Sequence, residues 1–368
     1  VPRSPDTAAG APCFVGREEE LDILNGAFEG LASGKGGIIL VRGEAGEGKS
    51  RLVEEFSGNV RRRQGLVLVG GCSDHDIETP FGWLIQVLRV YGARFMRYDD
   101  NRQHVVREMI RQHCGTAAQL LHRLDPAVTE MLGDLPPVVS LESGQEVQRF
   151  CRVACSFLCA VASAEGPTVV IIEDLQWMDN AGRRVLGELL HGVKTVPLLV
   201  VITCRSGGVD VQEFPGCDAG DVSGDGAVSS IVLRGLGRNE TGEMVEQASG
   251  TMKPLPGAVV DMVYRTSRGN PLFIREMVQY LSGEEPSSII RRKHIDVPPT
   301  LAEMIRKRID RFNNREKNIL FHAAVMGKEF DPVLLTGLCA GGGRDVHVVL
   351  ERARYVLAVL QKGIEYQL

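Results

Sequence analysis

The chain has 368 residues, which is enough for two or three domains with sizeable cores. Its formal net charge of −5 argues against nucleic acid or a membrane surface as a dominant partner, and no apolar run reaches the roughly 18 residues of a spanning helix. Nine cysteines without C-x-x-C spacing argue against a disulfide framework and favour a reducing compartment, so we expect a cytoplasmic protein.

A phosphate-binding loop is the strongest signal near the start of the chain, after residues 1–12, which we expect to be a disordered lead-in rich in Pro, Ala and Gly. An apolar run at 38–41 and an amphipathic segment at 51–63 flank eight residues with the pattern G-x-x-x-x-G-K-S: Gly43, Glu44, Ala45, Gly46, Glu47, Gly48, Lys49 and Ser50. Glycines let backbone N–H groups turn around phosphate oxygens, and the following helix directs its positive dipole end at the same anion. We expect Lys49 to reach the β- and γ-phosphates and Ser50 to ligate Mg²⁺.

Further strands are predicted at 66–69, 169–172, 198–202 and 231–233, because each is a short apolar run. Apolar strands that alternate with helices indicate a parallel sheet covered on both faces, so the fold class is α/β over residues 13–234. The interval 72–166 is too long for one crossover helix, and helical patterns at 81–90, 104–124 and 146–164 predict a helical insertion. Within it, Cys151, Cys155 and Cys159 share one helix face and are expected to pack in the core. Residues 206–229, rich in Gly, Asp and Ser, are predicted to form a mobile loop.

After Gly235 the strand signals stop. Helical patterns at 239–249, 256–267 and 271–282 predict an all-helical lid, which with its linker extends over 235–296. Further helical patterns at 301–311, 314–325, 331–338 and 345–361, followed by an apolar end at 364–368, predict a winged-helix domain over 297–368 whose last strand pairing is missing.

Two polar sites follow the predicted strands. Glu173 and Asp174 end the third strand, and parallel strands deliver such acids to the edge of the sheet where the phosphate loop lies. We expect Glu173 to hold the metal and Asp174 to polarise the attacking water, although the reverse assignment stays open. Arg205 ends the fourth strand, where it is expected to face the γ-phosphate or, alternatively, to be an ordinary surface arginine.

The motifs together resemble those of the STAND-class P-loop ATPases, relatives of the AAA+ ATPases that include Orc1-like AAA modules. Five further blocks carry the resemblance: Phe14-Val15-Gly16-Arg17-Glu18, Glu173 to Asp179, Thr203-Cys204-Arg205, Gly269-Asn270-Pro271-Leu272-Phe273 and Val297 to Leu301. The resemblance implies that ATP or ADP contacts Val15, Gly16, Arg17, the phosphate loop at 43–50 and the next residue, Arg51. It also implies that Pro271 packs by the adenine.

The resemblance also implies a three-part switch inside a larger chain, in which ADP holds the parts closed and ATP opens them. Hydrolysis is expected to be slow, and its output in similar proteins is a nucleotide cyclase, a protein kinase or a LuxR-type regulator. The expected partners are ATP, other domains of the same full-length chain, and a second copy in a nucleotide-dependent assembly.

Two alternatives remain open. The Glu173–Asp174 order, reversed from the usual one, is compatible with a nucleotide-gated scaffold that hydrolyses poorly. An Orc1/Cdc6-like DNA-binding initiator is the other alternative. It is disfavoured by the acidic charge and by Asp310 and Glu316, which interrupt the basic residues at 307, 308, 311 and 315.

Overall fold

The computed structural model describes residues 14–72, 80–138, 143–206, 228–249, 256–281, 312–326, 332–339 and 346–350, with 303, 306, 309, 310 and 353. The chain divides into two compact units. The first contains residues 1–240 and 269–272, and the second contains residues 241–268 and 273–368. The predicted lead-in and the end of the predicted wing lie outside the described residues.

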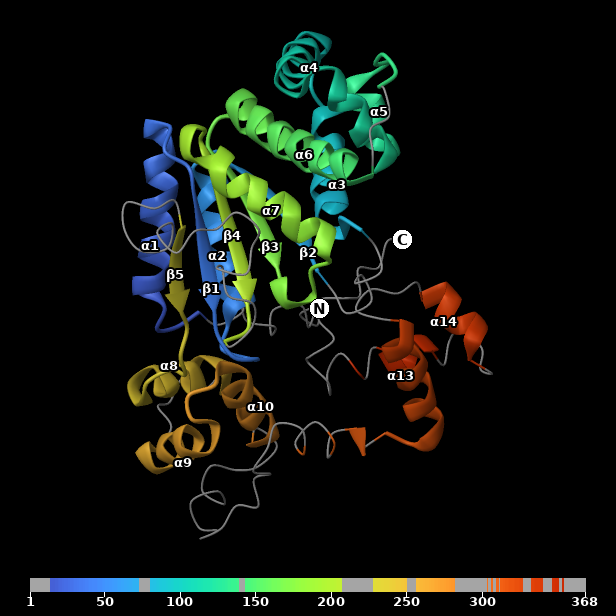
Figure 1. The fold of residues 1–368 in the computed structure, drawn as a ribbon. Coiled ribbons are helices and arrows are strands. Elements are labelled where there is room, and N and C mark those ends of the chain that lie inside the picture. The colour runs from blue at the N-terminus through green and yellow to red at the C-terminus, as the bar shows by residue number, and fades with distance from the viewer. Residues whose placement is uncertain are drawn as a thin grey trace, which may run out of the picture. The chain divides into compact units, whose positions relative to one another are not determined.

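A five-stranded parallel sheet forms the centre of the first unit, in the order β2-β3-β4-β1-β5 (Figure 1). The strands are β1 (Gly37–Arg42), β2 (Leu66–Gly71), β3 (Thr168–Glu173), β4 (Leu198–Cys204) and β5 (Val228–Val232). This is the P-loop NTPase fold class predicted from the sequence. The strand predictions were correct within a few residues, except that β5 begins at Val228, inside the segment predicted to be a mobile loop.

Alternating side chains of each strand enter two separate cores, which is why these strands read as continuous apolar runs. Ile38 and Leu40 of β1 pack in one core, with helices α3 (Gly82–Phe95), α6 (Ser143–Glu165) and α7 (Asn180–Gly192). Ile39 and Val41 pack in the other, with helices α1 (Glu18–Gly30) and α2 (Lys49–Arg62). The 3.6-residue spacing of the apolar residues in α2 predicted this buried face correctly.

The insertion between β2 and β3 is helical, as predicted, and its elements form the upper part of Figure 1. They are α3 (Gly82–Phe95), α4 (Asp100–Cys114), a 3-10 helix (Gly115–Arg123), α5 (Pro126–Leu132) and α6 (Ser143–Glu165). A single helix over 104–124 was the wrong prediction. Gly115 has φ of +60° and ends α4, and the side chain of Asp125 caps the new helix α5.

Helix α6 is the one described helix that is long and apolar enough to cross a membrane, over residues 144–165, whereas the sequence had suggested no such candidate. Within this window 56% is buried, and its apolar side chains pack in the core beside β3. Cys151, Cys155 and Cys159 are among those buried side chains, which confirms their predicted packing role. The burial identifies α6 as a core helix.

Strand β3 leads through a 3-10 turn (Leu175–Trp177) into α7 (Asn180–Gly192), which a second 3-10 turn (Val193–Thr195) joins to β4. Helices α8 (Arg238–Ser249), α9 (Gly257–Ser267) and α10 (Pro271–Leu281) follow β5, close to their predicted bounds. In the second unit, α13 (Asn314–Met326) and α14 (Pro332–Leu338) pack with residues 346–350 around Ile319 and Leu335. The predicted linker and most of the helix predicted at 301–311 lie outside the described residues, as do 345, 351, 352 and 354–361 of the helix predicted at 345–361.

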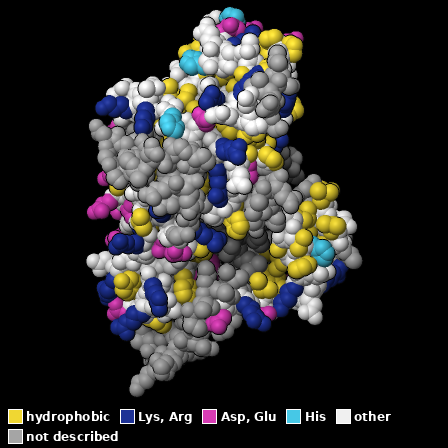
Figure 2. All heavy atoms as spheres, viewed as in Figure 1, with side chains coloured by type: hydrophobic (Ala, Val, Ile, Leu, Met, Phe, Trp, Pro, Cys, Tyr) yellow, Lys and Arg dark blue, Asp and Glu magenta, His cyan; other side chains and the backbone are white. Residues whose placement is uncertain are grey.

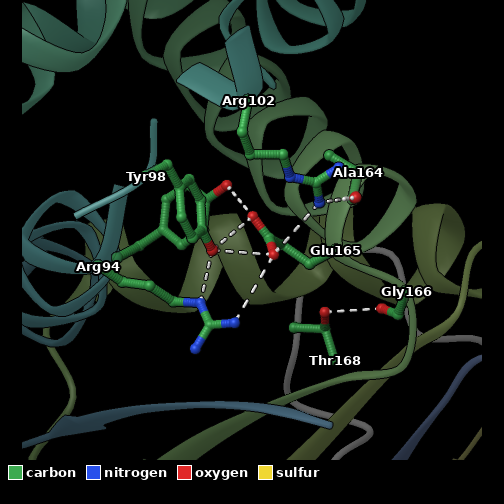
Figure 3. Close-up of polar contacts among 8 residues, drawn as sticks. Arg94, Tyr98, Arg102, Ala164, Glu165, Gly166 and Thr168 are labelled. Atoms are coloured by element: carbon green, nitrogen blue, oxygen red, sulfur yellow. Dashed lines mark hydrogen bonds and ion pairs between the residues drawn. The ribbon is translucent and has the colours of Figure 1, made fainter. Parts of the chain in front are cut away.

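Near the amino end of β3, a buried carboxylate at the end of α6 joins helices of the insertion (Figure 3). Glu165, just before β3, accepts hydrogen bonds from the hydroxyls of Tyr91 at 2.9 Å and Tyr98 at 3.0 Å. Arg94 and Arg102 lie 3.9 and 3.6 Å from its second oxygen. The Glu165 side chain is only 5% exposed, so these partners replace the water that an ionised carboxylate needs.

Candidate nucleotide site

The phosphate loop connects β1 to α2 at the carboxyl edge of the sheet. Gly46 and Gly48 have φ values of +85° and +90°, a region that residues with a side chain rarely adopt. Gly48 directly precedes α2, so the first N–H groups of this helix face the loop. This backbone geometry suits the phosphate-binding turn that the motif predicts.

Lys49 lies across the start of the loop. Its Nζ donates to the carbonyl oxygens of Gly43 at 2.7 Å and Glu44 at 3.0 Å. Burial lowers the pKa of Lys49, and the carboxylates of Asp174 and Glu47 oppose that shift. The lysine, one acid from β3 and one acid from the loop therefore belong to a single electrostatic site.

Glu173 and Asp174 occupy different environments at the end of β3. Glu173 is still in the strand, and its carbonyl accepts the N–H of Cys72 at 2.9 Å. Asp174 leaves the strand with φ of +59°, and its N–H donates to the Thr203 hydroxyl at 3.0 Å. The side-chain amide of Gln176 donates to the Asp174 carboxylate at 3.0 Å. The structure thus brings Asp174 into the electrostatic field of Lys49.

Arg205 begins the segment that leaves β4 beside the loop. The backbone fixes its position because Gly43 N–H donates to Cys204 O at 3.2 Å and Ser206 N–H donates to Gly43 O at 3.3 Å. Arg205 is exposed, and its charge also acts on Lys49. Burial raises the pKa of the neighbouring Cys204 thiol, which sits in the core of the sheet.

The N-terminal block Val15-Gly16-Arg17 packs against the loop from another direction. Arg17 is 8% exposed and donates from Nη2 to the carbonyls of Glu47, at 3.3 Å, and Arg234. Its Nη1 donates to Glu20 at 3.0 Å. A side chain expected to contact nucleotide is therefore bonded to the backbone of the phosphate loop itself.

Asn270, Pro271 and Leu272 lie on the loop although 225 residues separate Asn270 from its partner. Asn270 Nδ2 donates to Ala45 O at 2.9 Å, and Leu272 N–H donates to Gly46 O at 3.2 Å. A Cβ on Gly46 would come within 2.6 Å of the Asn270 side chain. Pro271 was expected at the site, whereas the backbone contacts of its two neighbours were not predicted.

Ser50 and Arg51 are the first residues of α2 after Lys49. Ser50 is exposed, and its hydroxyl is an oxygen ligand of the kind that Mg²⁺ takes. The Arg51 guanidinium pairs with Glu55 at 3.0 Å and lies 5.5 Å from the ring centroid of Phe14. The side chain of Arg51 thus joins the N-terminal block to α2.

A model of a family described as "AAA ATPase domain" matches residues 13–201. A curated relative, the uncharacterized protein R02095 of Rhizobium meliloti, is 27% identical over 286 residues. That alignment covers 74% of this chain and 25% of the relative, so the chain spans a quarter of the relative's length.

Solved structures with a similar fold include the Orc1 protein of Aeropyrum pernix in complex with DNA. It has a TM-score of 0.43 and 14% identity, and the match covers 94% of this chain and 85% of the other. A RuvB variant of Thermotoga maritima has a TM-score of 0.40 and 14% identity, covering 94% and 88%. DnaA of Aquifex aeolicus with AMPPCP has a TM-score of 0.38 and 11% identity, covering 95% and 94%.

Proposed function

The chain belongs to the AAA ATPase domain family, and from that premise we propose that it is the regulatory switch module of a larger protein. In this proposal the module binds ATP with Mg²⁺, hydrolyses it slowly and changes the arrangement of its parts between the ADP and ATP forms. It is a STAND-class switch of the cytoplasm, with a helical lid over 235–296 and a winged helix over 297–368.

The observation that carries this proposal is the pair of hydrogen bonds between the phosphate loop and residues 270–272. Asn270 and Leu272 bond to the carbonyls of Ala45 and Gly46, on the same turn whose N–H groups would surround phosphate. Any change of this turn on nucleotide binding also moves the acceptors that hold the start of α10. Nucleotide occupancy and the placement of this helix are then linked by two short contacts.

The donor chemistry of the site fits a magnesium nucleotide. A lysine, the N–H groups at the start of α2 and the exposed Arg205 suit phosphate oxygens, whereas the Ser50 hydroxyl and the two carboxylates suit Mg²⁺. Bound Mg²⁺ would neutralise phosphate charge. We assign Glu173 to the metal and Asp174 to the attacking water, and Arg205 to detection of the γ-phosphate.

Release of phosphate from ATP separates an ATPase from a nucleotide-gated scaffold. The wild-type protein should release phosphate slowly but above background, and Asp174→Asn should abolish turnover while it keeps nucleotide binding. Binding without turnover in the wild type would leave the scaffold as the better description. Glu173→Gln is the matched variant, because it changes the neighbouring acid. It should weaken Mg²⁺-dependent ATP binding more than it lowers the rate at which bound ATP is hydrolysed.

We assign the output of the switch to other parts of its own full-length chain or to a second copy of the module. A nucleotide cyclase, a kinase or a transcription regulator is the class of output that this proposal includes. Basic and acidic side chains both occur on the described part of the face shown in Figure 2, and the net charge of −5 supports a protein partner over DNA. Salt-dependent binding to duplex DNA in a filter assay would favour the initiator alternative instead.

A further inference from the structure

Residues 44–47 of the phosphate loop close into a small ring. Glu47 N–H donates to Glu44 O at 3.3 Å, and Glu44 N–H donates to the Glu47 carboxylate at 2.5 Å. The first bond is that of a backbone turn, and in the second the Glu47 side chain reaches back to the N–H three residues upstream, as the glutamate of a capping box does. A side chain at a variable position of the motif therefore fixes the shape of the loop.

The position of this carboxylate is confirmed by its neighbours. Its Oε2 lies 2.8 Å from where a Cβ on Gly43 would be, so the side chain folds back over the first turn. Arg17 donates to the Glu47 carbonyl at 3.3 Å and restrains the same residue from its other side. Glu47 is partly buried, in contrast to the exposed Glu44.

Glu47 also places a negative charge beside the cation expected to bind phosphate. Lys49 is held on the carbonyls of Gly43 and Glu44, the two residues that the Glu47 carboxylate approaches. A nucleotide triphosphate entering this loop without a metal would bring several negative charges close to that carboxylate. Like charges at short range near a protein surface oppose binding, and a divalent cation on the phosphates reduces that repulsion.

We propose that Glu47 is a specificity-determining residue of the phosphate loop: it shapes the first turn and disfavours free nucleotide relative to the magnesium complex. This inference rests on the proposed function, since it concerns the same nucleotide site. The ligand class that the loop selects is a magnesium-bound nucleoside polyphosphate.

The experiment compares ATP affinity with excess Mg²⁺ and with EDTA, by calorimetry, for wild type and three variants. Glu47→Gln keeps an oxygen acceptor for Glu44 N–H but removes the charge. Glu47→Asp keeps the charge. Glu44→Gln is the matched control, because it removes the same charge from an exposed neighbour in the loop.

The ratio of ATP affinity in Mg²⁺ to ATP affinity in EDTA should be large in wild type and in Glu47→Asp. In Glu47→Gln this ratio should be smaller by roughly tenfold, because ATP binds more tightly in EDTA once the charge is removed. Glu44→Gln should keep a ratio close to that of wild type. An unchanged ratio in Glu47→Gln, or an equal fall in Glu44→Gln, would overturn the proposal. If wild type bound ATP in neither condition, the proposed function itself would fail. Wild-type binding that is equal in both conditions would refute the role of Glu47 and the assigned magnesium ligands, but it would leave nucleotide binding itself in place.

Discussion

The acids beside the two ends of β3, Asp174 after the strand and Glu165 three residues before it, lie in contrasting surroundings. At its carboxyl end, Asp174 is held by Thr203 and Gln176 and lies in the field of Lys49, beside a loop whose contacts are mostly to backbone carbonyls. At its amino end, Glu165 is buried and bonded to two tyrosine hydroxyls. The first acid is partly exposed and the second is enclosed.

This difference suggests that the fold separates binding from stability. Contacts at the carboxyl edge can be exchanged for those of a ligand, because side chains such as Lys49 hold only the backbone of their own loop. Contacts at the amino edge join α3, α4 and α6, and breaking them leaves a buried charge without partners. Substitutions at the two ends should therefore affect different measurements.

Lys49→Ala should have the largest effect on function and little effect on folding. Removing the charged donor should weaken ATP binding by at least roughly 100-fold, since no other cation follows within the loop. Calorimetry measures the affinity, and thermal unfolding without nucleotide should give a melting temperature close to wild type. A mutant that nucleotide stabilises as much as wild type would show that the site is placed wrongly.

Glu165→Ala should have the opposite result, with a large effect on folding and little effect on ATP binding. The substitution removes the acceptor of Tyr91 and Tyr98 and the partner of two arginines, and we expect a loss of about 2 kcal/mol in the free energy of unfolding. Arg94→Ala is the matched control, because Arg94 is 51% exposed and should cost less than about 1 kcal/mol. Urea unfolding measures both variants, and equal losses would refute a special role for the buried carboxylate.

Arg17→Ala tests whether a side chain at the carboxyl edge of the sheet, beside the phosphate loop, contributes to the stability of the fold as well as to ATP binding. It leaves the carbonyls of Glu47 and Arg234 without their buried donor, so ATP affinity should fall by roughly tenfold and stability by about 1 kcal/mol. Arg62→Ala, whose guanidinium is 70% exposed and lies 3.6 Å from Glu55 on α2, should change both quantities less. If the two variants matched, Arg17 would be no more important to the loop than a surface arginine.

The last expected effect appears only at alkaline pH, as a loss of stability from buried thiols. Burial raises the pKa of Cys114 to about 12 and of Cys151 to about 11, from an ordinary value of 9.0. Because the folded state holds these protons longer than the unfolded state, their contribution is complete below pH 9 and is lost as pH rises through the folded pKa values. The free energy of unfolding at pH 10 should therefore fall less in a Cys114→Ala, Cys151→Ala variant than in wild type.

The phosphate loop at the carboxyl edge of the sheet was easier to predict from the sequence than the contacts of Glu165 near the amino edge. A phosphate loop is local, since its glycines, lysine and flanking elements occupy 14 consecutive residues from Gly37 to Ser50. The contacts of Glu165 join residues up to 74 positions apart, and tyrosines and arginines in helices carry no pattern that assigns them to one carboxylate. The strand order was likewise outside what apolar runs can specify.

Two features at the binding edge were also missed. Arg17 was expected to contact nucleotide, but its partners in the structure include two backbone carbonyls, which have no signature in a sequence. Asn270 and Leu272 belong to the sequence block at 269–273, in which only Pro271 was predicted to lie at the nucleotide site. Their contacts with Ala45 and Gly46 depend on how the chain returns to the loop after more than 200 residues.

Hydrogen exchange at the amide of Leu272 tests the central claim most directly. This N–H donates to Gly46 O in the phosphate loop, so a switch that rearranges the loop should change its protection. We predict different exchange rates at Leu272 in the ADP-bound protein and in the protein bound to a non-hydrolysable ATP analogue, with the amide of Tyr91 in α3 unchanged. Equal rates at Leu272 in the two bound forms would contradict a switch that acts through this contact.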